Sequence, residues 1–271
     1  MTHKVIRIQG CQRHGGKPSV GVGLIMSATL VPPTAAVARA NPRDRLKDYL
    51  EALQYYLSLP QWAIDRILFV DNSDGDLEPL SDLVRHLPHD KDVELISFAG
   101  NDHPYQRGKA YGEFKLLDYG LANTTLFRSD DIVWKTTGRL KFLNLPEMIE
   151  RSRGLRFDVL CDLHNVPGVG SGAWHDYQHM DLRVFAFRVR AYDLMLRDIW
   201  RTREVGLDGG FMYRHMRQHQ CPGLRVIPRF PLQARLQGIS GRHQRDYMSS
   251  SQRAKDAFRA VARRITPWLW L

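Results

Sequence analysis

The feature that most constrains the fold is a regular alternation of apolar runs and helical patterns over the first 165 residues. The apolar runs predict buried strands at 23–30, 64–70, 93–98, 132–134 and 157–163. Apolar residues spaced by three and four predict helices at 44–59, 77–87, 110–126 and 146–152. Strands that alternate with helices favour βαβ units and a largely parallel sheet. We therefore predict an α/β fold with a Rossmann-like, mostly parallel sheet flanked by helices.

The second half of the chain is less regular. A strand is expected at 182–187, helices at 191–200 and 209–218, a late strand at 226–230, and loops at 168–172 and 237–252. We divide the chain into a nucleotide-binding half at 1–165, an acceptor-side half of the same domain at 166–250, and a basic amphipathic C-terminal helix at 251–271. The acceptor-side half is expected to be irregular.

The net charge limits the classes of partner, and the cysteines indicate the cellular compartment. The net charge of +10 suits nucleic acid, an anionic membrane surface, or anionic substrates such as nucleotide diphosphates; a merely solvated basic surface is the alternative. No recognisable nucleic-acid module is present, so we predict no nucleic-acid partner.

The three cysteines, Cys11, Cys161 and Cys221, are odd in number and far apart, which favours a reducing compartment and a cytoplasmic location. No apolar run is long enough to cross a membrane.

Polar residues follow three of the predicted strands. Open α/β sheets bind ligands at the carboxyl ends of their strands, and loops follow Leu30, Val70 and Trp134. Asp71 is placed to accept hydrogen bonds from a base edge or a ribose hydroxyl, although a turn or helix-cap role is equally consistent with the sequence. The residues predicted to bind substrate in these loops are Thr29, Asp71, Asn72, Ser73, Lys135, Thr137 and Gly138.

A further phosphate site is predicted where the helix at 110–126 begins. Backbone N–H groups and the positive end of a helix suit a diphosphate. Gly108 and Gly112 would permit close approach, and Lys109 adds charge. The Gly-Lys-Ser/Thr ending of a Walker loop is missing, and ordinary helix-start chemistry is the alternative.

The segment Lys-Thr-Thr-Gly-Arg at 135–139 is the sharpest signal. Glycine lets the chain turn or approach a ligand, and arginine offers two parallel donors to phosphate oxygens. Lys135 and Arg139 would stabilise a departing nucleoside diphosphate, a role otherwise filled by a divalent metal. The alternative is a strand end with exposed cations.

A group transferase that acts on a hydroxyl acceptor needs a base to take the proton of that hydroxyl. The candidate carboxylates are Asp162, Asp181, Glu204 and Asp208. We prefer Asp208 over Asp181, although an Asp at a helix start is often only a cap. Asp162 and His164 also resemble a metal pair, but two ligands alone are weak evidence. His215, on the helix after Asp208, is a further predicted substrate-binding residue.

The C-terminal segment has an amphipathic pattern. Phe258, Val261, Ala262, Ile265 and Leu269 share one helical face, and Arg253, Lys255, Arg259, Arg263 and Arg264 surround it. Basic residues beside the tryptophans at 268 and 270 suit a helix that lies on an anionic membrane. A helix packed on the domain is the alternative.

Taken in order, six short segments resemble those of bacterial GT-A-like glycosyltransferases of lipopolysaccharide and capsule synthesis. They are Ser-Ala-Thr-Leu-Val-Pro at 27–32, Arg-Leu-Lys-Asp-Tyr at 45–49, Ala-Leu-Gln-Tyr-Tyr at 52–56, Val-Asp-Asn-Ser at 70–73, Gly-Lys-Ala-Tyr-Gly at 108–112, and the segment at 135–139. The resemblance covers roughly residues 20 to 215, and 70–73 is similar to the Val-Asp-Asn-x-Ser element of family-2 transferases.

The resemblance implies a GT-A-like fold, a nucleotide-sugar donor and a glycan acceptor, often lipid-linked, as in surface polysaccharide synthesis. A lipid-linked acceptor would give the C-terminal helix a role in peripheral contact with the inner face of the cytoplasmic membrane. GT-A enzymes place a metal-binding Asp-x-Asp near 135–139, where this chain carries cations. We therefore predict no cofactor, with Mn²⁺ or Mg²⁺ as the alternative.

Two other functions fit parts of the pattern. A non-catalytic polyanion- or nucleic-acid-binding protein would account for the charge alone. Another α/β group transferase, such as a sulfotransferase, would account for the alternating strands and helices, but its expected phosphate loop after the first strand is absent.

Overall fold

A computed structural model of the chain describes residues 3–10, 22–33, 37–102, 105–166, 177–201, 206–218, 221–241, 244–266 and 270. The predicted glycine-rich loop at 168–172, the candidate base Glu204, and Cys11 lie outside these residues.

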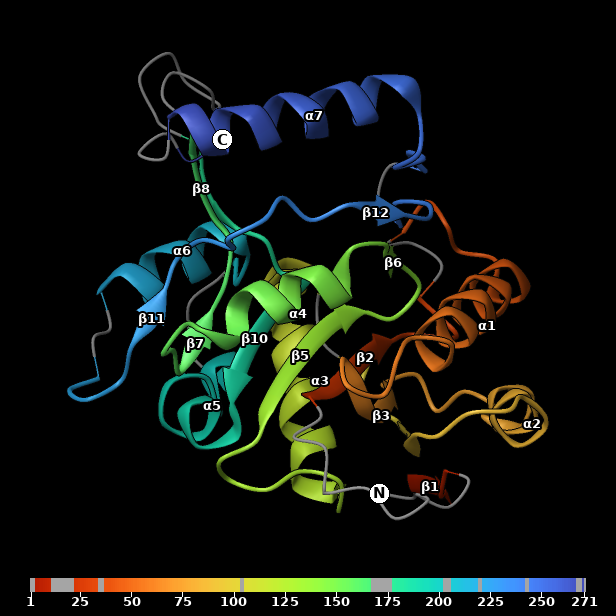
Figure 1. The fold of residues 1–271 in the computed structure, drawn as a ribbon. Helices are drawn as coiled ribbons and strands as arrows, with labels where there is room; N and C mark the ends of the chain where they lie inside the picture. Colours follow the sequence, from red (N-terminus) through yellow and green to blue (C-terminus); the bar gives the residue numbers. More distant parts are fainter. Residues whose placement is uncertain are drawn as a thin grey trace.

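The core is an eight-stranded sheet in the order β1-β4-β3-β2-β5-β10-β7-β11 (Figure 1). Its strands are β1 (His3–Ile8), β2 (Val22–Ala28), β3 (Ile64–Asp71), β4 (Asp92–Phe98), β5 (Ile132–Thr137), β7 (Val159–Leu160), β10 (Val184–Arg188) and β11 (Val226–Ile227). Six of the eight run in one direction, and β1 and β10 run against them. The predicted α/β class with a mostly parallel sheet is confirmed.

Strand β2 lies at the centre of the sheet, which explains its composition. All seven of its residues are buried, because β3 pairs along one edge, β5 pairs along the other, and helices cover both faces. Such a strand has a continuous apolar run rather than an alternating one. In the register of the sheet, Ala28 pairs with Asp71 and Ser27 pairs with Thr137. The carboxyl ends of β2, β3 and β5 are therefore level.

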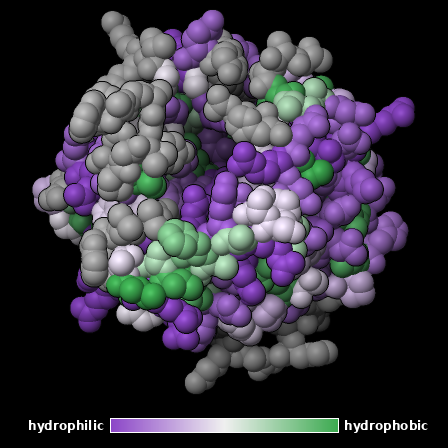
Figure 2. All heavy atoms as spheres, turned by 90° about the horizontal axis from the view of Figure 1, so that it is seen from above, coloured by the Kyte–Doolittle hydropathy of each residue, from purple (hydrophilic) through white to green (hydrophobic). Residues whose placement is uncertain are grey.

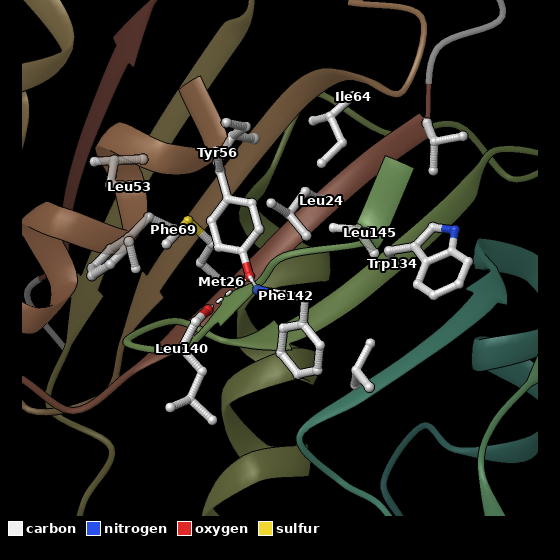
Figure 3. Packing of buried hydrophobic residues seen from close by; sticks show 14 of the residues in the cluster. Leu24, Met26, Leu53, Tyr56, Ile64, Phe69, Trp134, Leu140, Phe142 and Leu145 are labelled. Carbon is white, nitrogen blue, oxygen red and sulfur yellow. Dashed lines mark hydrogen bonds between the residues drawn. The ribbon is translucent and has the colours of Figure 1, made fainter. Parts of the chain in front are cut away.

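Helices cover the two faces of the sheet. On one face lie α1 (Pro42–Leu57), α2 (Glu78–His86) and α4 (Leu145–Arg153), and on the other α3 (Lys109–Asn123), α5 (Val189–Met195) and α6 (Gly209–Gln218). Tyr56 joins α1 to the segment after β5 inside the first layer (Figure 3). Its hydroxyl donates a hydrogen bond to the carbonyl oxygen of Leu140 (2.7 Å) and accepts one from the backbone N–H of Phe142 (3.2 Å).

The second half of the chain completes the same sheet. Strands β10 and β11 extend it beyond β5, and two small ribbons stand outside it. These ribbons pair β6 (Lys141–Phe142) with β12 (Leu236–Gln237), and β8 (Leu163–Val166) with β9 (Tyr177–Met180). Two short 3₁₀ turns lie at Tyr105–Arg107 and Ile199–Arg201. The predicted strand at 157–163 is in fact split between β7 and β8.

The last helix, α7 (Ser250–Ile265), crosses the end of the molecule toward which β5 points (Figure 1). It is the predicted C-terminal helix. None of the helices in the described ranges is long and apolar enough to span a bilayer.

Candidate active site

The loops after β2 and β3 are joined to each other by side-chain hydrogen bonds. Thr29 Oγ1 donates to Asn72 Oδ1 at 2.7 Å, and Ser73 Oγ accepts from the backbone N–H of Val31 at 2.9 Å. The carbonyl oxygen of Thr29 accepts from Arg45 Nε at 2.6 Å. Four of the predicted substrate-binding residues, Thr29, Asp71, Asn72 and Ser73, are thus brought together at the carboxyl edge of the sheet.

Asp71 is buried and holds this edge together. One carboxylate oxygen accepts from the backbone N–H of Leu30 (2.7 Å) and from the hydroxyl of Ser73 (2.7 Å). The other accepts from the backbone N–H of Gly75 (2.8 Å) and the hydroxyl of Ser97 (2.8 Å). These contacts match the turn-forming alternative for Asp71, because both of its carboxylate oxygens accept hydrogen bonds from the protein.

The segment 135–139 divides into a buried part and a turn. The sequence predicts that β5 ends at Trp134, but β5 continues to Thr137, so the expected turn is shorter than predicted. Lys135 is fully buried; its ammonium lies 2.7 Å from Glu113 Oε1 and donates to the carbonyl oxygen of Leu182 (2.5 Å). A lysine in this position neutralises an α3 carboxylate, which leaves Arg139 as the cation of the turn.

Gly138 makes the turn possible. Its N–H donates to the carbonyl oxygen of Ser27 (2.8 Å), and a Cβ at this position would lie 2.8 Å from the same oxygen. Only glycine allows this close approach of β5 to β2. The turn places Arg139 immediately beyond the sheet edge.

Arg139 borders a cavity of about 370 Å³ between α1 and residues 237–239, 246 and 248. Its guanidinium donates to the carbonyl oxygen of Ile239, and burial lowers its pKa. The other lining residues are Arg39, Asp44, Lys47, Asp48, Glu51, Lys141, Gln237, Gly238, Asp246 and Met248. Within the described part of the chain no carboxylate lies within ion-pair distance of Arg139, whereas Arg39 pairs with Asp48 (2.5 Å) and Lys141 pairs with Glu51 (3.2 Å).

The start of α3 is packed against the segment that precedes α6. Gly108 has φ +84°, and a Cβ there would collide with the carbonyl oxygen of Leu207. That oxygen accepts a hydrogen bond from the backbone N–H of Ala110 (3.0 Å). One of the helix-start donors is therefore engaged by protein, and Lys109 stands exposed at the first position of α3, while Gly112 is buried inside it.

The same segment positions Asp208. The backbone oxygen of Asp208 accepts from Met212, and its Oδ1 accepts from the N–H of Phe211 (3.0 Å), so Asp208 caps α6. The residue is exposed. Because Leu207 contacts the start of α3, the predicted sites at Gly108–Lys109 and at Asp208 lie side by side.

Asp181, the second candidate base, is instead held by Arg183. Asp181 is buried, and Arg183 donates to its two oxygens at 2.8 and 2.7 Å. Burial alone would raise the pKa of Asp181, but the Arg183 guanidinium holds it well below its usual range. A carboxylate so engaged is a weak proton acceptor, so Asp181 is poorly suited to act as a base. The carbonyl oxygen of Arg183 also accepts from the N–H of Thr137 (2.8 Å), which ties this pair to the end of β5.

Asp162 and His164, the candidate metal pair, are joined at this edge by two residues that the sequence did not place there, Arg263 and His179. Arg263 of α7 donates to Asp162 at 3.0 and 2.8 Å, and Asp162 lies 3.7 Å from His164. The ring of His164 is 6.5 Å from that of His179, whose pKa burial lowers. His179 packs on the start of α6, where a Cβ on Gly209 would collide with its ring. These contacts link Asp162, 101 residues distant from Arg263 in sequence, to the region of Asp208.

His215 lies away from this edge. Its Nε2 is 2.9 Å from the carbonyl oxygen of Met195 in α5, and its ring stacks on Phe211. His215 lies about two helical turns after Asp208, and its imidazole is directed toward α5.

Several acidic and histidine side chains lie close together at this edge. Among the residues that the structure describes, no three His, Cys, Asp or Glu side chains are arranged to hold a metal ion. Asp162 and Asp181, the buried carboxylates nearest the histidines, are each engaged by an arginine. Metal independence of the reaction stays a prediction.

No protein-family model and no curated protein matches the sequence. Similar solved structures include 4-diphosphocytidyl-2C-methyl-D-erythritol synthase from Anaerococcus prevotii, with 8% identity, 88% of this chain and 95% of that chain covered, and a TM-score of 0.46. A second synthase of that description has 11% identity, coverages of 88% and 96%, and a TM-score of 0.42. The Francisella tularensis 2-C-methyl-D-erythritol 4-phosphate cytidylyltransferase has 11% identity, coverages of 63% and 73%, and a TM-score of 0.36. Similarity at this level does not establish a family or an activity for the chain.

Proposed function

We propose that this protein is a glycosyltransferase that moves a sugar from a nucleotide-sugar donor to a glycan acceptor, either free or lipid-linked, in surface polysaccharide synthesis. The observation that carries the proposal is that two groups lie at the carboxyl edge of the same mostly parallel sheet, Arg139 after β5 and Asp208 beside the start of α3. Arg139 supplies a cation without a carboxylate partner in the described residues, and Asp208 supplies an exposed carboxylate at a helix start.

Arg139 is the proposed ligand of the donor diphosphate. A cavity of about 370 Å³ is within the range that holds small ligands. The cations that line it differ in their availability, since Arg39 and Lys141 are paired with carboxylates while the guanidinium of Arg139 donates to a backbone carbonyl. A diphosphate would therefore be bound chiefly by Arg139, together with the exposed Lys47.

Asp208 is the proposed general base. In the transfer, the acceptor hydroxyl gives its proton to the Asp208 carboxylate as its oxygen bonds to the anomeric carbon of the donor. The bond between that carbon and the diphosphate oxygen breaks, and the electron pair leaves with the nucleoside diphosphate. Arg139 stabilises the charge that develops on this leaving group. No step in this scheme requires a metal.

The test is donor turnover by the purified full-length protein with a panel of nucleotide sugars, each with and without EDTA. The expected result is slow hydrolysis of one donor, unaffected by EDTA, together with binding of the matching nucleoside diphosphate. Absence of turnover and of binding for every nucleotide tested would exclude the proposal. A strict requirement for a divalent ion would instead overturn the role assigned to Arg139.

A further inference from the structure

Helix α7 turns its polar side toward the body of the protein and its apolar side outward. Phe258, Val261 and Ile265 are 65%, 54% and 68% exposed. They are spaced by three and four residues, so they share one face with Ala254 and Ala257. A surface helix normally buries its apolar stripe, so this arrangement is the reverse of the usual one.

The inward face of α7 is held by polar contacts. Arg263 donates to both oxygens of Asp162, to the carbonyl oxygen of Phe230 (2.8 Å), and to the side chain of Gln233 (3.1 Å). Gln252 is buried on the same side and contacts Asp256. Because Arg263 is anchored to residues near the carboxyl edge, α7 is fixed in this orientation and its apolar face stays outward.

Basic side chains flank the exposed apolar stripe. Arg253 and Arg264 lie along one border of the stripe and Lys255 along the other, all three exposed. Asp256 is the one acidic residue of the helix, beside five basic residues. Figure 2 looks down on the end of the molecule that carries α7 and shows hydrophobic atoms at the surface beside hydrophilic ones. A groove of about 360 Å³ lies alongside, lined by Val166, Ala254, Lys255, Phe258 and Arg259.

We propose that the outer face of α7 docks on an anionic lipid surface. An apolar stripe between rows of cations is the pattern of a helix that lies in the membrane interface, with its apolar side chains among the acyl chains and its cations at the phosphates. The charge complementarity of these cations with anionic headgroups selects a membrane over an apolar protein partner. Docking in this way would place the carboxyl edge of the sheet toward the membrane, since α7 lies over that edge (Figure 1).

The experiment is sedimentation of the full-length protein with vesicles of phosphatidylcholine alone or with added phosphatidylglycerol. The wild-type protein is expected to bind only the anionic vesicles and to dissociate as salt is raised. Phe258→Glu should lower the bound fraction at least about tenfold, because the aromatic side chain that would enter the lipid is replaced by a charged one. Arg253→Gln combined with Arg264→Gln should weaken binding by about fivefold per charge removed.

The matched control is Leu194→Glu, because Leu194 is 67% exposed and belongs to α5, a helix that lies apart from α7 (Figure 1). It should leave vesicle binding unchanged. Equal binding by the Phe258→Glu variant and the wild type would overturn the proposal. So would a dimer, seen by sedimentation velocity without lipid, that dissociates on the same substitution. No substrate is present in this assay, so its failure is separate from failure of the proposed sugar transfer.

Discussion

The ammonium group of Lys135, on β5, lies 2.7 Å from the carboxylate of Glu113, on α3, in the interior of the protein. The pair joins the sheet to the helix that covers it. The same lysine also donates a hydrogen bond to the carbonyl oxygen of Leu182. Lys135 therefore contributes to the packing of α3, and its cation is not presented at the sheet edge.

Replacement of Lys135 should lower stability. In Lys135→Met the carboxylate of Glu113 loses its cation inside the protein, which costs about 3 kcal/mol, at the low end for a broken buried pair because Glu113 is partly exposed. Urea unfolding followed by circular dichroism measures this change. Adding Glu113→Gln should recover part of the loss, since no charge is then left unpaired. A single variant as stable as the wild type would show that the pair is dispensable.

Replacement of Arg139 should affect transfer much more than folding. Arg139→Ala removes the proposed phosphate ligand and should lower kcat/KM about 100-fold or more, as for loss of a transition-state donor. Lys141→Ala is the matched control, because Lys141 lines the same cavity but is paired with Glu51. Steady-state transfer rates and thermal melts of the two variants separate the effects. Similar rate losses in both would argue that the cavity as a whole, and not Arg139, binds the donor.

Replacement of Asp208 should lower turnover without loss of donor binding. Asn is also a good helix cap, so Asp208→Asn should keep the start of α6 while removing the base. The expected fall in kcat is about 10²- to 10⁴-fold, with nucleoside diphosphate affinity unchanged by calorimetry. An unchanged kcat would remove Asp208 from the mechanism and leave it as a cap only.

The sequence was sufficient for the strands and helices whose burial depends on nearby residues. The strand at 64–70 and the helix at 209–218 are continuous local patterns, and both were found. The end of β5 was misplaced, because Lys135 looks like a turn residue until Glu113 is brought beside it from another element. The Arg263–Asp162 pair could not be predicted either, because its two residues are 101 positions apart in the sequence. Amphipathic spacing identified α7, but which face it buries depends on that distant pair.

The Asp181–Arg183 pair should make stability dependent on acid. Arg183 holds the pKa of Asp181 well below its usual range despite burial, so the pair stabilises the fold fully above the unfolded pKa of about 4. That contribution is lost as pH falls toward the lower folded pKa. Asp181→Asn should therefore lower the free energy of unfolding by about 3 kcal/mol at pH 7. The difference in free energy of unfolding between the variant and the wild type should become smaller below about pH 4. Urea unfolding of both proteins at pH 7 and below about pH 4 tests this prediction. A difference in stability that does not change with pH would assign the effect to packing.

Replacement of Gly108 should disturb both α3 and Asp208. At φ +84° an alanine is strained, and its Cβ would collide with the carbonyl oxygen of Leu207, the residue before Asp208. Gly108→Ala should therefore lower stability by about 1–3 kcal/mol and reduce transfer as well, because the segment that positions the base must shift. Gly206→Ala offers the control, since Gly206 has the same φ of +84° but its Cβ would meet no atom of the described residues within 4 Å. It should share the strain yet retain more activity; equal activity losses in the two variants would mean that the contact with Leu207 does not matter.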